Sequence, residues 1–402
     1  MKVLISAYAC EPERGSEPGC GWNWSRAAAR NHDVWVLTRA NNRPRIEPAL
    51  AARRQPRLHF VYVDLPVWAR FWKRGRVGVR AYYVLWQIAA ARAARRLHRV
   101  HEFDVVHHLT FANMWLPALV CVTRAPFVLG PIAGGQRVPR ALYRALGARG
   151  AASELLLLAL RAVNRANPLV RYAWTRAVLI LANNGETLQA LPRKHRRKTA
   201  LRPNASVERA VAARPSAPAP GAPLALYAGR LNRFKGVSVV IEAVRMSPAW
   251  RLVVAGEGPD RRRLQRLARR NGLDGRVTFV GWLPQERLWE QLEHASAVVL
   301  PSFKEGASFV AAEAQSFGVP VVAFDRGGPA ALARTTGARF ELVRPGPPSV
   351  SARDFAAALD RLEQRSVPAA VADFGLDAVA ADLADLYARA AAGTARPPRA
   401  RG

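Results

Sequence analysis

The stretch AVVLPSFKEGASFVAAEAQSFGVPVVAFDRGGP, residues 297–329, decides the fold expected for this chain. Its segments 297–300 and 319–324 are short apolar runs rich in β-branched residues, which is typical of parallel strands buried on both faces. Between them, 309–317 has the composition of a helix. In such a strand, loop, helix, strand unit, ligands bind at the carboxyl ends of the strands and at the helix amino terminus. We therefore expect a binding site in the loop at 302–308.

Two carboxylates lie beside that expected site. Glu305 is in the loop, and Glu313 is one to two turns into the helix. Their spacing alone leaves two interpretations open. Both can bind a ligand, or Glu305 can favour the positive helix end while Glu313 is solvated. The residues around them favour the first interpretation.

The wider pattern resembles the signature of the retaining glycosyltransferases of family 4, which have the GT-B fold of two Rossmann-like domains facing a cleft. E-G at 305–306 is followed by E-A at 313–314, G-V-P-V-V at 318–322 and G-G-P at 327–329. The resemblance implies that Glu305 contacts the donor sugar and that Glu313 binds the ribose hydroxyls. The backbone amides between them would meet the diphosphate. The chain departs from the pattern at Gln315-Ser316, usually M-A or L-A, and at Ala331, often Glu.

A second match to that family lies at 229–236, where the chain reads G-R-L, three further residues and K-G. It leaves Arg230 at the end of a strand and Lys235 at the start of the next helix. Two cations placed in this way can converge on one diphosphate. The alternative is an ordinary surface pair. A further family-like turn, G-W-L-P at 281–284, is expected to hold the nucleobase largely through its backbone.

The amino terminus carries a third feature. A buried strand at 2–8 opens into A-C-E-P and G-S-E-P-G-C-G-W before a helix at about 22–29. This stretch is similar to the glycine-rich loop that faces the cleft in the resembling enzymes. Gly19 and Gly21 would then let the backbone approach the donor phosphate, and Glu17 would meet an acceptor hydroxyl. The alternative is an ordinary strand-to-helix turn.

Two histidines stand at the carboxyl end of a strand expected at 105–107, where active-site groups collect. Because neighbouring strand positions face opposite sides, at most one of His107 and His108 is expected to point at the substrate. We predict His108 as a catalytic group and His107 as an acceptor contact. The alternative for each is a capping or core hydrogen bond. The family's usual cleft histidine has no counterpart, because 130–135 reads G-P-I-A-G-G.

The predicted site falls into three groups. The catalytic group is Arg230, Lys235, Glu305 and His108. The donor-binding group is Gly19, Gly21, Trp282, Leu283, Gly306, Ala307, Ser308, Phe309 and Glu313. The acceptor-binding group is Glu17 and His107.

Strands with helices between them recur along the chain, which favours parallel, doubly wound sheets. At 402 residues, two domains of about 200 residues each are the natural division. We expect a Rossmann-like acceptor-binding domain at 1–203 and a Pro/Ala-rich linker, running along the surface, at 204–222. A nucleotide-sugar-binding domain is expected at 223–375, followed by a helix and a basic tail at 376–402.

The formal charge of +32, carried mostly by arginine, suggests an anionic partner or a compositional bias. Aromatic residues interleave with arginines at 68–99, which suits a lipid headgroup interface, although a core-packing helix explains it equally. The apolar and basic region at 138–176 is a second candidate for membrane contact or acceptor binding. Nucleic acid is not expected, because its familiar binding motifs are absent.

Other functional classes are disfavoured. Three cysteines without a paired C-x-x-C spacing favour neither disulfides nor zinc, and no D-x-D occurs, so we expect no metal and no cofactor. No apolar stretch approaches the roughly 20 residues that span a bilayer, and no signal peptide is recognised. A cytoplasmic protein, peripheral on the inner membrane face, is expected. A dehydrogenase is disfavoured, since no G-x-G-x-x-G follows the first strand.

The resemblance to the retaining glycosyltransferases of family 4 implies one function. The chain would move a sugar, with retention, from a UDP- or GDP-linked donor to a polysaccharide or glycolipid acceptor. The alternatives are a GT-B epimerase or phosphorylase, and a non-catalytic membrane or nucleic-acid binding protein on the same scaffold.

Overall fold

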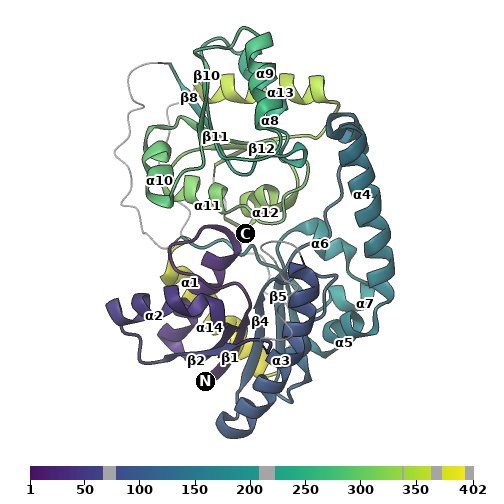
Figure 1. The fold of residues 1–402 in the computed structure, drawn as a ribbon, viewed down its shortest axis with the longest axis vertical. Helices are drawn as coiled ribbons and strands as arrows, with labels where there is room; N and C mark the ends of the chain where they lie inside the picture. Colours follow the sequence, from purple (N-terminus) through teal and green to yellow (C-terminus); the bar gives the residue numbers. More distant parts are fainter. Residues whose placement is uncertain (67–77, 208–221, 337–338, 364–373, 394–402) are drawn as a thin grey trace. The chain divides into compact units, whose positions relative to one another are not determined.

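The computed structural model describes residues 1–66, 78–207, 222–336, 339–363 and 374–393 (Figure 1). The chain forms two compact units. Unit 1 comprises 1–135, 160–208 and 374–402, and unit 2 comprises 136–159 and 209–373. Each unit is built on one parallel sheet, so the predicted pair of doubly wound sheets is confirmed.

The sheet of unit 1 has seven strands in the order β3-β2-β1-β4-β5-β6-β7. Their bounds are Lys2–Ala7 (β1), Asp33–Arg39 (β2), Leu58–Val63 (β3), Val105–Thr110 (β4), Phe127–Ile132 (β5), Ala177–Ala182 (β6) and Thr199–Leu201 (β7). The strand order reverses between β1 and β4, which are neighbours although two strands lie between them in sequence. β4 and β5 are buried along their whole length, as the apolar run of β5 predicts, and the burial of β4 includes its two histidines.

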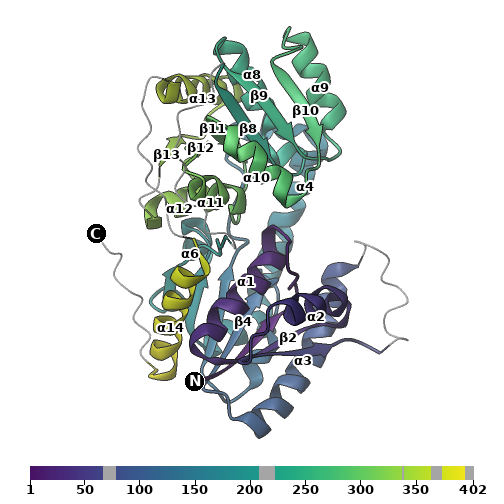
Figure 2. The same ribbon diagram turned by 90° about the vertical axis from the view of Figure 1, so that its left-hand side faces the viewer.

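Helices cover both faces of this sheet. Their bounds are Ser16–Asn31 (α1), Arg43–Ala52 (α2), Val79–His101 (α3), Pro168–Arg176 (α5), Gly185–Ala190 (α6), Arg193–Arg196 (α7) and Leu376–Ala391 (α14). Figures 1 and 2 show α14, in yellow, beside α1, in purple. The carboxyl-terminal helix therefore completes the amino-terminal unit.

Helix α3 presents its aromatic residues to the core. Tyr82, Tyr83 and Trp86 are at most 2% exposed, and the rings of Tyr83 and Trp86 both lie 5.2 Å from that of Tyr8. The core-packing interpretation of this part of the 68–99 cluster is therefore correct, and the membrane interpretation is not supported for α3. Residues 68–77 lie outside the described part of the chain.

The sheet of unit 2 has six parallel strands in the order β10-β9-β8-β11-β12-β13. Their bounds are Leu224–Ala228 (β8), Arg251–Ala255 (β9), Val277–Gly281 (β10), Ala297–Leu300 (β11), Val321–Phe324 (β12) and Phe340–Val343 (β13). The helices are Val237–Met246 (α8), Arg261–Arg270 (α9), Gln285–His294 (α10), Phe309–Ser316 (α11), Gly327–Thr336 (α12) and Pro348–Glu363 (α13). Figure 1 shows α8, α9 and α13 on one face of the sheet and α10, α11 and α12 on the other.

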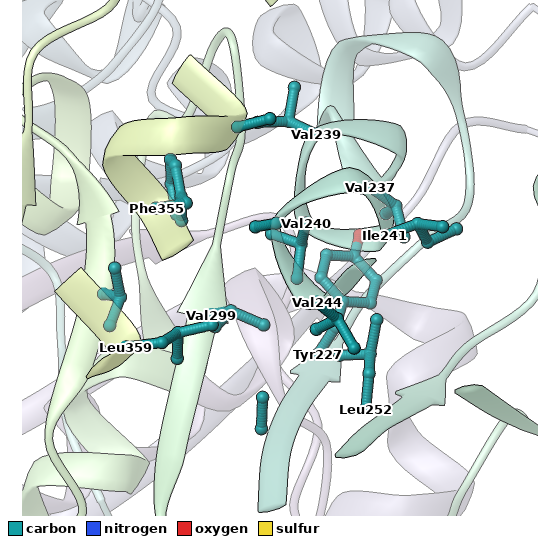
Figure 3. Close-up of a cluster of buried hydrophobic side chains, with 14 of the residues drawn as sticks. Tyr227, Val237, Val239, Val240, Ile241, Val244, Leu252, Val299, Phe355 and Leu359 are labelled. Carbon is teal, nitrogen blue, oxygen red and sulfur yellow. The ribbon is translucent and has the colours of Figure 1, made fainter. Parts of the chain in front are cut away.

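The core of unit 2 lies where α8 meets α13 and the sheet (Figure 3). Val240 and Val244 of α8, spaced four residues apart, share one face of that helix. They pack in a cluster with Phe355 of α13 and with Tyr227 and Val299 of the strands, all of them at most 1% exposed. This packing fixes the carboxyl ends of β8 and β11, where the candidate site is found.

The units depart from the expected division in two places. Helix α4, Tyr143–Ala166, contains the boundary: residues 136–159 belong to unit 2, although they lie between β5 and β6 of unit 1. Residues from 374 onward belong to unit 1. The expected surface linker is also buried at 204–207, since Val207 is 3% exposed and its N–H donates to Phe374 O at 2.9 Å. Residues 208–221 lie outside the described residues.

No helix in the described residues is both long enough and apolar enough to cross a membrane.

Candidate functional site

The candidate site of unit 2 is formed by the loops that leave β8 and β11. These strands are neighbours, and the strand order reverses between them, so their loops diverge and leave room for a ligand. The first loop, 229–236, contains Arg230 and Lys235, and the second, 301–308, contains Glu305. The structure thus brings the two motifs from distant parts of the sequence to one edge of the sheet.

A glycine allows the two loops to touch. Gly236 has φ +64°, and a Cβ added there would lie 2.1 Å from the carbonyl oxygen of Pro301. The two loops are also joined by a hydrogen bond, in which Phe303 N–H donates to Phe234 O at 2.8 Å. A side chain at position 236 would therefore force the loops apart.

The start of α12 supports the Glu305 loop from the other side. Gly328 N–H donates to the carbonyl oxygen of Glu305 at 3.0 Å. Gly327 has φ +61°, and a Cβ there would lie 2.3 Å from that same oxygen. The G-G-P sequence that follows β12 is therefore required for close backbone contact with the loop.

Lys235 and Glu305 form an ion pair across the two loops. Their side chains are 26% and 18% exposed, so both remain accessible. Ser302 Oγ donates to the same Glu305 oxygen, Oε2, at 3.0 Å. The predicted cation and carboxylate therefore meet directly, and each neutralises the other in this structure.

A second ion pair holds the same loop to α4. Lys304 Nζ lies 2.5 Å from Glu154 Oε2, and the side chain of Glu154 is 0% exposed. The other carboxylate oxygen of Glu154 accepts a hydrogen bond from Val138 N–H at 3.3 Å. Lys304 Nζ also lies 5.3 Å from the ring centroid of Phe234. One lysine thus connects α4 with both loops of the site.

Glu313 is buried on the second turn of α11. It is 8% exposed, and its Oε1 accepts a hydrogen bond from Gln285 Nε2 at 2.5 Å. Burial raises the pKa of Glu313 to about 7, and the hydrogen bond from Gln285 lowers it in part. This carboxyl group therefore changes its charge near neutral pH.

The amino terminus of α11 presents backbone N–H groups to the loop at 301–308. The first N–H groups of a helix have no partner within it, and the helix dipole makes this end positive. Gly306 and Ala307 are half-buried, and Phe309 is the first residue of the helix. Ser308 Oγ is buried and has no hydrogen-bond partner among the described residues. These groups suit an anion.

The remaining predicted residues of unit 2 are exposed to differing degrees. Arg230 is exposed, and its guanidinium has no ion-pair partner in the part of the chain that the structure describes. Its backbone carbonyl accepts a hydrogen bond from the Tyr227 hydroxyl at 3.1 Å. Trp282 is 70% exposed after β10, and Leu283 is half-buried. Trp282 therefore offers a free aromatic face.

Glu17 holds a loop of unit 1. Its carboxylate accepts a hydrogen bond from Phe111 N–H, and Phe111 has φ +57°, which is unusual for a residue other than glycine. Burial raises the pKa of Glu17, while the hydrogen bonds from the backbone of Phe111 and Ala112 lower it in part. The structure thus shows Glu17 stabilising the turn after β4. Its contact with an acceptor hydroxyl stays a prediction.

Gly19 and Gly21 lie inside α1, which begins at Ser16, earlier than the expected start near 22. A Cβ at Gly19 would lie 1.9 Å from Arg14 O, and one at Gly21 would lie 2.2 Å from Ala9 O. These contacts account for both glycines within the fold, and the predicted approach of their backbone to a donor phosphate stays a prediction. The chain's own carbonyl groups fill the space beside both glycines, which let the loop after β1 pack on the helix.

Both histidines of β4 are core residues. His107 is 0% exposed, with Nδ1 2.8 Å from Tyr387 Oη and Nε2 2.6 Å from Gly130 O. His108 is 1% exposed, with Nε2 3.0 Å from Tyr83 Oη and Nδ1 3.3 Å from Ser6 Oγ. Burial lowers the pKa of His107 to about 4 and that of His108 to about 3. The predicted catalytic and acceptor roles are not supported, because neither ring has a free nitrogen.

The sequence predictions missed two residues of the site. Gln285 contacts Glu313, and it follows directly after the predicted nucleobase turn, at the first position of α10. Glu154 is the only acidic residue between Arg137 and Gly185, and a lone acid in a basic and apolar segment is a signal for a buried ion pair. Among the described residues, no group of three or more His, Cys, Asp or Glu side chains is placed to hold a metal ion.

Comparison with known proteins points to one family. Residues 209–369 match the family model described as glycosyl transferases group 1. A D-inositol 3-phosphate glycosyltransferase of Streptomyces griseus is 35% identical over 193 residues, which cover 44% of this chain and 41% of that protein. The chain spans less than half the length of the curated relatives that it matches.

Solved structures resemble the whole chain. A sucrose-phosphate synthase from Thermosynechococcus elongatus has a TM-score of 0.60 and 18% identity, covering 96% of this chain and 98% of that one. Anabaena HepE in complex with UDP-glucose has a TM-score of 0.55 and 18% identity, covering 96% and 99%. At these identities the likeness shows the fold alone.

Proposed function

We propose that this chain is a glycosyltransferase, because residues 209–369 match the family model of the glycosyl transferases group 1 and the chain has the GT-B fold. It takes a sugar from a nucleotide-sugar donor and transfers it, with retention at the anomeric carbon, to an acceptor hydroxyl. The observation that carries this proposal is the Lys235–Glu305 pair, which lies where the strand order reverses and beside the open amino terminus of α11.

The charges of the site suit a diphosphate leaving group. When the bond between the anomeric carbon and the donor oxygen breaks, its electron pair goes to the diphosphate. Lys235, Arg230 and the N–H groups of α11 can stabilise that charge as it develops. Glu305 is placed to contact the sugar, and Ser302 and Lys235 hold its carboxylate in one orientation.

Glu313 and Gln285 support the nucleoside part of the proposed donor. A carboxylate accepts hydrogen bonds from both ribose hydroxyls, and charged acceptors bind more strongly than neutral ones. Trp282 offers an exposed ring for stacking on the base. A UDP-sugar is the first donor to test, because Anabaena HepE has been solved with UDP and with UDP-glucose.

We further propose that transfer needs no divalent metal, because cations of the chain itself surround the proposed diphosphate position. The test is turnover in excess EDTA. Activity that is lost there and returns with Mg²⁺ or Mn²⁺ would contradict this part of the proposal.

The family match is confined to 209–369, which contains the proposed donor site. The identity of the acceptor therefore has less support than that of the donor. We propose a glycan or lipid-linked acceptor in polysaccharide or glycolipid assembly, with the enzyme in the cytoplasm and peripheral on the membrane. Retention is tested by NMR of the first sugar anomer released or transferred.

The proposed donor site is tested by thermal denaturation of the full chain with a panel of UDP- and GDP-sugars. A ligand that binds only the folded state raises the melting temperature in proportion to ln(1 + [L]/Kd). We expect one nucleotide class to raise it and free glucose not to. If no nucleotide sugar shifts the transition of a folded sample, a non-catalytic binding protein becomes the better interpretation.

A further inference from the structure

Exposed apolar side chains gather in one segment of the described chain, 155–172. Four of them belong to unit 1, and we call these the 160–172 face: Leu160, Val163, Leu169 and Tyr172. Their exposed fractions are 44%, 70%, 46% and 45%. Single exposed apolar residues are ordinary on a protein surface, whereas a run of them on consecutive helices needs an explanation.

The spacing places these residues on helix faces. Leu160 and Val163 lie three residues apart at the end of α4, and Leu169 and Tyr172 lie three apart on α5. Only Asn167 separates the two helices, and its side chain accepts a hydrogen bond from Leu169 N–H at 3.0 Å. The 160–172 face is therefore held by ordered backbone.

Helix α5 carries apolar residues on its exposed side, beside Arg171 and Thr175, as well as on its buried side. Val170, Ala173 and Trp174 are at most 2% exposed and fill the core of unit 1. A surface helix of a soluble protein usually opposes such a core face with polar residues. Here Leu169 and Tyr172 occupy exposed positions instead.

The surroundings of this face are basic. No acidic residue occurs between Glu154 and Glu186. Arg165 and Arg171 are exposed, and neither guanidinium has an ion-pair partner among the described residues. Helix α7 adds further cations beside α5, since the rings of His195 and Trp174 are 6.0 Å apart. Burial, followed by the charges of Lys198, Lys194 and Arg171, lowers the pKa of His195 to about 4.

We propose that the 160–172 face docks on an anionic lipid surface. Apolar side chains would enter the boundary between headgroups and acyl chains, while Arg165 and Arg171 stay among the anionic headgroups. Each such cation adds an electrostatic attraction to the surface, and salt weakens that attraction. Nucleic acid fits less well, because the aliphatic Leu160, Val163 and Leu169 provide no ring on which a base can stack.

The test is sedimentation of the full chain with phosphatidylcholine vesicles that contain or lack phosphatidylglycerol. We expect binding only with phosphatidylglycerol, and weaker binding as salt rises from about 0.05 M to about 0.5 M. Arg165→Glu/Arg171→Glu should weaken partitioning at least roughly tenfold. Val163→Ser/Tyr172→Ser should also weaken it, and more visibly at high salt, where the apolar contribution remains.

Two matched variants separate this face from the general positive charge. Arg262→Glu/Arg266→Glu changes the charge by the same amount on the exposed side of α9 in unit 2, and Val100→Ser changes a residue that is 75% exposed on α3. Both should bind vesicles nearly as the wild type does. Circular dichroism confirms that each variant is folded.

Three results would overturn the proposal. The wild type could ignore anionic vesicles at low salt, the variants of the 160–172 face could bind as the wild type does, or the α9 variant could lose as much binding as they do. A light-scattering mass of a dimer that the Val163→Ser/Tyr172→Ser variant abolishes would assign the face to a second copy of the chain instead.

Discussion

Lys235 and Glu305 face each other at the centre of the proposed donor site. Because the ion pair is only partly exposed, removing one partner leaves the other without its counter-charge in a partly desolvated place. The two residues are therefore expected to respond differently to substitution, since a diphosphate is attracted by the lysine and repelled by the glutamate.

Lys235→Ala should lower the maximal rate of transfer by roughly 10²- to 10³-fold, the effect typical of losing one preorganised charge-stabilising group. Arg230→Ala should act in the same direction. Steady-state kinetics with folded protein measures both. Lys235→Ala with wild-type rate and wild-type donor affinity would move the site elsewhere.

Glu313 should make donor binding depend on pH. Its pKa is raised to about 7 by burial, so the carboxylate that accepts from the ribose hydroxyls forms only as pH rises through about 7. We expect the donor Michaelis constant to fall between about pH 6 and pH 8, with less change in the maximal rate, because the ribose does not react. Glu313→Gln should raise the donor Michaelis constant and make it independent of pH over this range. A wild-type profile that is flat over that range would contradict the assignment.

The raised pKa of Glu313 also makes the unfolding free energy depend on pH. The folded state holds the Glu313 proton more tightly than the unfolded state, so this group favours folding at pH below about 4.5. That contribution is lost as pH rises towards about 7. Glu313→Gln should therefore reduce the decline in unfolding free energy over this range, as measured by urea denaturation at several pH values.

At the scale of elements, one lysine ties α4 to the site. Lys304→Met would leave the fully buried Glu154 carboxylate without its ion-pair partner, and we expect a loss of roughly 3–5 kcal/mol in unfolding free energy. Lys304→Met/Glu154→Gln should recover part of it. The Arg361–Glu341 pair, whose side chains are 48% and 18% exposed, is the control, because breaking an ion pair nearer to solvent should cost less than breaking the Lys304–Glu154 pair. Equal losses for both pairs by urea denaturation would refute the structural role of Lys304.

The contact between the two loops depends on Gly236. Gly236→Ala combines a left-handed backbone with an overlap on Pro301 O, whereas Gly318→Ala has φ +69° and nothing within 4 Å of the added Cβ. The control variant, Gly318→Ala, should lose about 1–2 kcal/mol of unfolding free energy, and Gly236→Ala should lose clearly more. Melting temperatures of the two variants compare them directly, and equal shifts would mean that the loops separate easily.

Most elements could be predicted from residue patterns, and the exceptions have physical reasons. The strands around 297–300 and 319–324 were apparent because burial on both faces produces unbroken apolar runs. β7 has only three residues, and β13, which reads F-E-L-V, is mostly half-buried and contains an acidic residue, so neither strand shows an unbroken apolar run. The start of α1 was missed because Pro18, Gly19 and Gly21 read as a loop, whereas proline is tolerated in the first turn and the glycines meet carbonyl groups.

The candidate site was predictable where residues near in sequence carry it. Glu305, Glu313 and Lys235 lie beside strand ends that the apolar runs reveal. The histidines of β4 were misassigned because sequence cannot tell a strand end that faces solvent from one covered by α14, whose Tyr387 contacts His107. Gln285 and Glu154 were missed because, unlike Lys235 and Glu305, they belong to no motif that the sequence shows, and only the fold brings them to Glu313 and Lys304.

For the whole molecule, the two units exchange parts of the chain. Residues 136–159 belong to unit 2 and residues from 374 onward to unit 1, so neither unit is one continuous stretch. Local sequence patterns cannot reveal to which unit a segment belongs, because that assignment depends on contacts between distant positions, such as Lys304–Glu154 and His107–Tyr387. A fragment cut near residue 203 or 375 is therefore expected to lack part of its core.

Calorimetric titration of the full chain with UDP and with GDP tests the central claim most directly, because it needs neither the sugar nor the acceptor. We predict that one of the two binds and that Lys235→Ala weakens it roughly 10- to 100-fold, as expected for a lost charged hydrogen bond. Glu305→Gln should bind the nucleotide as well as or better than the wild type, and Arg361→Ala should bind unchanged. A folded wild type that binds neither nucleotide, or a Lys235→Ala variant that binds as tightly as the wild type, would contradict the account.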